Sequence, residues 1–124
     1  MSGDKEERRT GGALRVPFVR RCAIDFPNGA KATAFIVNIN VLGAYIALDD
    51  IPGLGQPVTC RFQMPESEQE VLVQGVIAWT NPSQPHPVHS LPPGFGVGFR
   101  DLSEENRGRI ESIVTEYVAR QGKG

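Results

Sequence analysis

Residues 37–46 have the sequence VNINVLGAYI, in which two short apolar runs flank a polar corner that ends in a glycine. The apolar runs favour strands, and the corner between them favours a tight connection. Gly43 can hold a positive φ or let another group come close to the backbone. Asn38 and Asn40 can bond to nearby amides or to a bound base. This stretch therefore predicts a turn between two strands that presents polar groups to a ligand.

Alternation of apolar and polar residues continues on both sides of this corner and makes most of the chain β. Strands are expected at residues 14–24, 32–37, 44–48, 58–64 and 71–80. The last of these segments is apolar on both faces, which is typical of a strand that is central or covered on its second side. That pattern suits a barrel carrying a helix.

The end of the chain has the pattern of an amphipathic helix. Ser103 is a good N-cap, and Glu104 and Glu105 complement the positive end of the helix dipole. Apolar residues follow at helical spacing, at Ile110, Ile113, Val114, Tyr117 and Val118. We expect this continuous stripe to pack on the core, and a dimer or partner interface is the alternative.

Residues 81–94 are rich in proline and hold both histidines, which excludes a helix and predicts a loop. Val88, Leu91 and Phe95 are candidates for a partner-binding or self-association patch on it. The alternative is a flap packed over the open end of the barrel. Nothing in the pattern holds the histidines on one face, so we expect no metal site.

Length and composition indicate one small domain. The chain has 124 residues, of which 40% are apolar and 22% charged, with a net charge of −1. We divide it into a flexible tail, residues 1–12, and a single domain, residues 13–121. With no strong charge, no apolar run long enough to span a bilayer and a polar N-terminus, we expect a cytoplasmic protein that neither binds nucleic acid nor inserts into a membrane. Cys22 and Cys60 are expected to be buried thiols.

The corner resembles the second signature of PilZ domains, bacterial receptors for cyclic di-GMP. That signature reads Asp or Asn, any residue, Ser, two residues, Gly; Asn38 and Gly43 fit it, and Asn40 replaces Ser. The resemblance extends to the start of a first strand at 15–18, and to a last strand at 96–99 followed by the start of a helix at 101–105. It implies a mainly β fold, a six-stranded antiparallel β-barrel with a C-terminal α-helix.

The arginines depart from the family pattern, in which two of them, with three residues between, precede the first strand. Arg15 aligns with the second, but the residue four positions earlier is Gly11. In one interpretation the flexible glycines let Arg8 or Arg9 swing back, so that they clamp the ligand together with Arg15. In the other the clamp is lost. Because Asn40 also replaces a small hydroxyl, we expect weak or lost nucleotide binding.

Arginines further along the first strand, Arg20 and Arg21, should face opposite sides of it. They are either strand-edge charges that discourage aggregation or contributors to a ligand site.

The resemblance implies a signalling adaptor that acts through protein partners, in motility, polarity or surface polysaccharide control. The first alternative is a functional cyclic di-GMP receptor, whose ligand site would be lined by Arg8, Arg9, Arg15, Asn38, Asn40 and Gly43. The second is an OB-like nucleic-acid-binding module, although its basic, aromatic groove is not evident in the sequence. We expect no enzymatic activity and no cofactor, and a homodimer is a further alternative.

Overall fold

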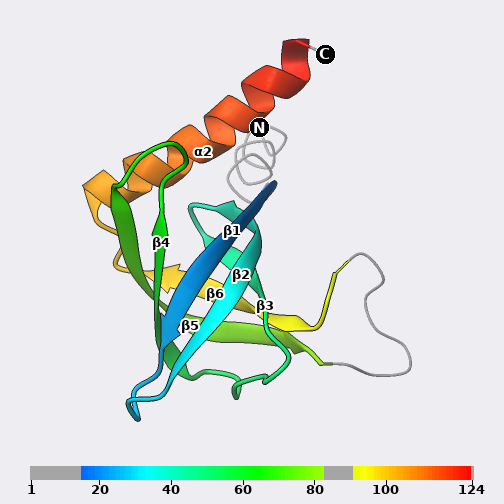
Figure 1. Cartoon of the computed structure of the whole chain (residues 1–124), viewed down its shortest axis with the longest axis vertical. Coiled ribbons are helices and arrows are strands. Elements are labelled where there is room, and N and C mark those ends of the chain that lie inside the picture. Colours follow the sequence, from blue (N-terminus) through cyan, green and yellow to red (C-terminus); the bar gives the residue numbers. More distant parts are fainter. Residues whose placement is uncertain (1–14, 83–90, 124) are drawn as a thin grey trace, which may run out of the picture.

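The computed structural model describes residues 15–82 and 91–123. Within them, six strands form a closed antiparallel barrel, and one helix lies at one end of it (Figure 1). The elements are β1 (Val16–Asp25), β2 (Lys31–Asn40), β3 (Gly43–Ala47), β4 (Pro57–Gln63), β5 (Glu70–Asn81), β6 (Gly94–Arg100) and α2 (Glu104–Lys123). The strand order around the barrel is β1-β2-β3-β6-β5-β4. The predicted fold class is confirmed.

The barrel closes where β1 meets β4, and this contact is short. We call it the β1–β4 seam, and it consists of the pairs Ala23↔Arg61, Ile24↔Cys60 and Asp25↔Thr59. By contrast, β4 pairs with β5 along its whole length, from Pro57 to Gln63. The two strands at the seam therefore diverge toward the end of the barrel that carries the helix.

In strand β5 only one of the two apolar faces is buried in the first half of the strand. Val71, Val73 and Ile77 point into the core, whereas Leu72 is 48% exposed. Strand β5 pairs with β4 on one side and with β6 on the other, so the prediction of a central strand is confirmed, although the outer face of its first half is not covered. The core inside the barrel is built from β-branched and aromatic residues of all six described strands and from helix residues, among them Val16, Ile24, Ile36, Ile46, Phe62, Phe95, Val97 and Ile110.

Strand β2 runs to Asn40, three residues beyond its predicted end at residue 37, because it contains a β-bulge. Its pairing with β3 shifts between Ile36 and Asn38, so Val37 is the extra residue. The bulge reverses the alternation, and Ile36 and Ile39 are both buried. Asn38 and Asn40 consequently belong to a strand and not to a loop.

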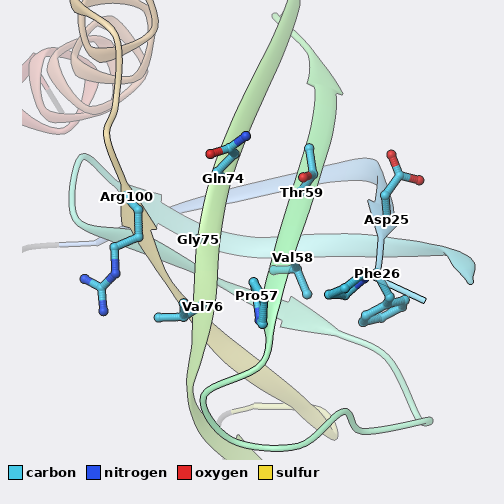
Figure 2. A pocket seen from close by; sticks show the side chains of 10 residues that line it. Asp25, Phe26, Pro57, Val58, Thr59, Gln74, Gly75, Val76 and Arg100 are labelled. Carbon is cyan, nitrogen blue, oxygen red and sulfur yellow. The ribbon is translucent and has the colours of Figure 1, made fainter. Parts of the chain in front are cut away.

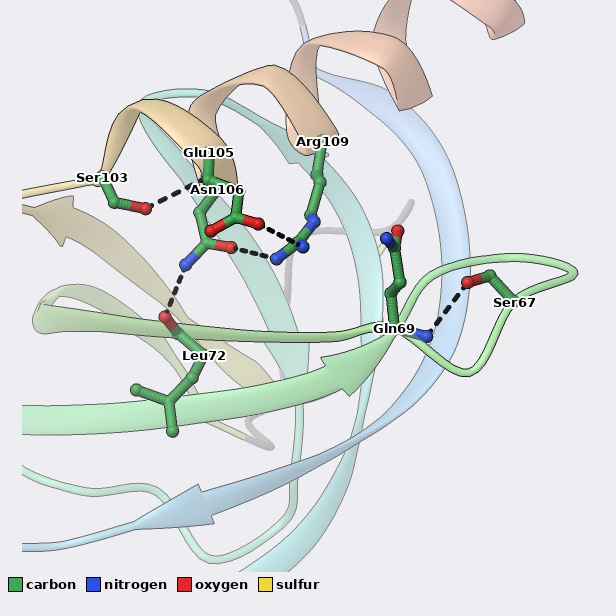
Figure 3. Close-up of polar contacts among 7 residues, drawn as sticks. All are labelled: Ser67, Gln69, Leu72, Ser103, Glu105, Asn106 and Arg109. Atoms are coloured by element: carbon green, nitrogen blue, oxygen red, sulfur yellow. Dashed lines mark hydrogen bonds and ion pairs between the residues drawn. The ribbon is translucent and has the colours of Figure 1, made fainter.

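Helix α2 begins as its sequence predicts and is attached to the barrel by a side-chain network (Figure 3). Ser103 Oγ accepts a hydrogen bond from the Asn106 amide at 3.0 Å, and this cap satisfies a first-turn donor. Asn106 Nδ2 donates to the carbonyl oxygen of Leu72 in β5 at 2.9 Å, and Arg109 donates to Asn106 Oδ1 and to Glu105. The first turns of the helix are therefore held against β5.

The buried side of the helix is shorter than the predicted stripe. Ile110 and Ile113 are buried, and Val114 and Tyr117 pack against the core from its edge. Val118 is 48% exposed, which corrects its assignment to the core-facing stripe. The reason is visible in Figure 1, where the last turns of the helix extend beyond the barrel. In the described part of the chain, no helix has the length and apolar character needed to cross a bilayer.

Candidate functional site

Asn40 shapes the corner between β2 and β3. Its Oδ1 accepts hydrogen bonds from the backbone amides of Leu42 at 2.8 Å and Gly43 at 3.0 Å. Asn40 is almost completely buried, so the two amides of the turn depend on its oxygen as their hydrogen-bond acceptor. Asn40 is therefore first a structural residue of the hairpin.

Gly43 is required because another strand comes close to it. It pairs with Asn40 on one side and with Gly98 of β6 on the other. A Cβ at this position would lie 2.1 Å from the carbonyl oxygen of Val97, a distance that no side chain can adopt. Of the two roles that a glycine could have here, the structure supports close backbone approach, since Gly43 is not among the glycines with positive φ.

Arg15 lies across this corner. One guanidinium nitrogen, NH2, is 3.3 Å from the position that a Cβ on Gly43 would occupy. Arg15 directly precedes Val16, which pairs with Ile39, and this register brings the arginine beside the end of β2. Burial lowers the pKa of the Arg15 guanidinium. Within the described residues no carboxylate forms an ion pair with it.

Asn38 lies on the same strand as Asn40, two residues earlier, and pairs with Pro17 on one side and Tyr45 on the other. Its Oδ1 is buried and has no hydrogen-bond partner in the described part of the chain. An unpaired buried oxygen costs free energy and often marks a functional position. Four predicted site residues therefore come together at the start of β1, the end of β2 and the start of β3: Arg15, which directly precedes β1, and Asn38, Asn40 and Gly43. The other two, Arg8 and Arg9, lie outside the described residues.

An aromatic pair next to Asn38 was missed by the sequence analysis. The rings of Tyr45 and Trp79 are 5.3 Å apart, and the Trp79 indole covers Gly96, where a Cβ would lie 2.2 Å from its Nε1. Tyr45 is fully buried and its hydroxyl donates to the carbonyl oxygen of Pro92 at 2.6 Å. Burial raises the pKa of this hydroxyl. Strand periodicity counted from Gly43 could have placed Tyr45 on the same face as the site.

Of the three residues predicted for the partner-binding patch, Phe95 is contradicted by the structure. Strand β6 begins at Gly94, and Phe95 pairs with Ile46 of β3 and is 0% exposed, inside the barrel. The alternation of β6 directs this ring inward, which the proline-rich sequence before it concealed. Leu91 is partly buried, and Val88 lies outside the described residues.

A hollow of about 410 Å³ lies on the outer face of β4 and β5, away from the corner (Figure 2). Its charged residues, Asp25 and Arg100, lie at opposite edges, with Val58 and Pro57 between them. Charged groups that do not converge are poorly placed for acid–base chemistry. Among the described residues no group of three or more histidines, cysteines, aspartates or glutamates could hold a metal ion.

Cys22 and Cys60 are buried free thiols, as predicted. Desolvation raises the pKa of each to about 12, so neither resembles an activated nucleophile.

A closed six-stranded antiparallel barrel, with a helix at one end and a polar corner joining β2 to β3, defines the PilZ class of domains. The model of the PilZ domain family matches residues 5–116 of the chain. The chain therefore belongs to the PilZ domain family. This match covers all six strands of the barrel and α2 as far as residue 116.

A solved structure described as the PilZ domain of CeSA from a cellulose synthesizing bacterium is similar in fold. It shares 13% sequence identity with a TM-score of 0.58, and the match covers 85% of this chain and 98% of that one. At this identity the likeness concerns the fold alone. No match was found among curated protein sequences.

Proposed function

We propose that the protein is a PilZ-type signalling adaptor that binds cyclic di-GMP weakly at the corner between β2 and β3 and acts through a protein partner. The observation that carries the nucleotide part is the position of Arg15 across Gly43, with no carboxylate paired to it in the described part of the chain. A guanidinium in this place can bind a phosphate with two hydrogen bonds or donate to the edge of a guanine.

Asn38 supports the same site. Its buried Oδ1 has no partner among the described residues, and a ligand that donates a hydrogen bond to it would remove the cost of leaving it unpaired. Guanine carries such donors on its Watson–Crick edge.

Two features argue for weak binding. Asn40 Oδ1 already accepts two backbone amides, so this oxygen is committed to the turn where the family has a small hydroxyl. The family's first arginine position is occupied by Gly11. Losing one charge-assisted hydrogen bond of roughly 1.5–3 kcal/mol weakens affinity about ten- to a hundredfold.

Calorimetric titration of the full chain with cyclic di-GMP tests this proposal. We expect a micromolar dissociation constant that Arg15→Ala weakens about tenfold or more. Arg107→Ala, which removes an exposed arginine on α2, is the matched control and should leave the affinity unchanged. Affinity that survives Arg15→Ala, or no binding up to millimolar ligand, would contradict the site.

The alternative of a fully functional receptor has a distinct outcome in the same experiment. A nanomolar dissociation constant that rises when Arg8 and Arg9 are replaced by Ala would show that these two residues complete the clamp with Arg15. The favourable observation is that the Arg15 guanidinium already lies beside Gly43, where such a clamp would need it.

The partner part of the proposal is supported by large apolar side chains that lie exposed around the corner, Leu42 at its tip and Val19 on β1. Val88 and Leu91 remain candidates for the contact. Replacing both by Ser should abolish partner binding or self-association while the melting temperature stays nearly constant. A large fall in melting temperature with association intact would contradict a contact role. Motility, polarity and surface polysaccharide control are the processes in which we place the adaptor.

A further inference from the structure

A second hollow, separate from the nucleotide corner, opens beside the β1–β4 seam. It has a volume of about 480 Å³, and its lining includes Arg20, Arg21, Ala23, Thr33, Arg61 and Glu70. The seam ends at the pair Ala23↔Arg61, and beyond this pair the two strands diverge. None of the residues that build the nucleotide corner lines this hollow.

Arg20 is fixed across the gap between the strands. Its Nε donates to the carbonyl oxygen of Gln63 and its NH2 to that of Met64, each at 2.9 Å. Gln63 is the last residue of β4 and Met64 follows it, at the end of the strand from which β1 has diverged. The guanidinium therefore takes the place of the backbone hydrogen bonds that β1 no longer makes to β4. Its positive charge stays beside the hollow, and the side chain would lose little conformational entropy on binding a ligand.

Arg21 is also held in place. It lies over the ring of Phe35, its neighbour in the β1–β2 pairing, with 6.0 Å from the guanidinium carbon to the ring centroid. Contact with an aromatic face leaves the edge of the guanidinium, with its hydrogen-bond donors, free to bind a ligand.

Arg61 has a hydrogen-bond donor that no acceptor among the described residues satisfies. Its NH2 is 3.4 Å from Asp25 Oδ2, but Lys31 Nζ binds the other oxygen of that carboxylate at 3.0 Å. One aspartate is thus shared between two cations. The Nε of Arg61 is buried and has no acceptor in the described part of the chain.

The charges lining the hollow do not balance. Three guanidinium groups face one carboxylate, that of Glu70, and in residues 15–82 and 91–123 no ion pair links Glu70 to them. The whole chain has a net charge of only −1, so this positive excess is local. Between the arginines stand short side chains, because Ala23 pairs with Thr33 on one side and with Arg61 on the other. The hollow therefore has both room for a ligand and the positive charge needed to bind an anion.

We infer that this hollow is a binding site for a phosphoryl group, with Arg21 and Arg61 as the groups that contact it and Arg20 as the residue that keeps β4 in position. Guanidinium forks match phosphate oxygens in geometry and form charge-assisted hydrogen bonds to them. A phosphoryl dianion also neutralises the excess of two positive charges. The phosphoryl group could be carried by a small molecule or by a phosphorylated side chain of a partner.

The test is an NMR titration of the full ¹⁵N-labelled chain with inorganic pyrophosphate at low salt. We expect saturable shifts centred on the amides of Ala23 and Thr33. Arg21→Gln and Arg61→Gln should each weaken binding about tenfold or more. Arg107→Gln removes one positive charge from the exposed surface of α2 and should change the affinity by less than twofold.

If Arg61→Gln destabilises the fold, Arg61→Lys keeps the charge but not the fork, and it should bind more weakly than the native chain while melting at a similar temperature. A second titration compares a short phosphoserine peptide with its unphosphorylated form. Tighter binding of the phosphopeptide than of pyrophosphate identifies a partner as the source, and the reverse identifies a small molecule. The inference is overturned if neither probe gives saturable shifts, or if Arg107→Gln weakens binding as much as Arg61→Gln.

Discussion

Replacing Asn40 by Ala should destabilise the protein by about 2–4 kcal/mol. The substitution removes the oxygen that accepts hydrogen bonds from the amides of Leu42 and Gly43, at 2.8 and 3.0 Å, where Asn40 itself is 3% exposed. A buried donor that loses its acceptor costs roughly 1–3 kcal/mol, and two donors are affected, of which the partly buried amide of Leu42 should cost about 1 kcal/mol. With a urea m-value of about 2 kcal/mol/M, the unfolding midpoint should fall by about 1–2 M at constant m.

Asn38→Ala is the matched control on the same strand. The Oδ1 of Asn38 makes no hydrogen bond within the described residues, so its removal should cost less than about 1 kcal/mol. Equal losses for the two variants would refute the reasoning, because they would show that the turn bonds of Asn40 are not what distinguishes the two asparagines. A loss below about 1 kcal/mol for Asn40→Ala would refute it as well.

Gly96→Ala should lower the melting temperature strongly and change the fluorescence of Trp79, because the new Cβ would lie 2.2 Å from the indole nitrogen; Gly98→Ala, with nothing within 4 Å of its Cβ, should do neither. Equal effects of the two substitutions would contradict the packing that we describe. Cys22 and Cys60, whose pKa values are raised to about 12 by burial, should react with a thiol reagent at pH 8 far more slowly in the folded protein than in urea. Reaction at the same rate in both states would show that the thiols are accessible.

The strands and the helix could be predicted from the sequence because each depends on a local pattern. Alternation in β4 places Val58, Cys60 and Phe62 inside, and all three are buried as expected. Ser103 caps the helix at the predicted residue. These features need only the period of the side chains and the chemistry of one cap.

The predictions from sequence are wrong where pairing with a distant strand decides the register of a strand or the burial of a side chain. The bulge at Val37 shifts the register of β2, and no local pattern marks it. Phe95 follows a proline-rich segment, but its place inside the barrel is set by its pairing with Ile46. Leu72 is exposed because it alternates with the buried Val71 and Val73 and faces outward, and Asn106 of α2 bonds to its backbone carbonyl.

The candidate site could be predicted in part. Arg15, Asn38 and Gly43 come together as the family signatures imply, because they lie at neighbouring positions of one hairpin and the strand beside it. The second hollow could not be foreseen. Arg61 is 38 residues from Ala23 in sequence, and only closure of the barrel brings the two together.

That closure has a consequence for the order in which the protein folds. The hairpins, such as the one between β1 and β2, form across short loops, whereas the β1–β4 seam closes a long loop and gains only three residue pairs in return. The seam should therefore be among the last parts of the barrel to form and the first to open, with fast amide exchange at Ala23 and Thr59 compared with the rest of the sheet. Because Arg20 bridges the same gap to the carbonyls of Gln63 and Met64, its two hydrogen bonds oppose opening of the barrel there.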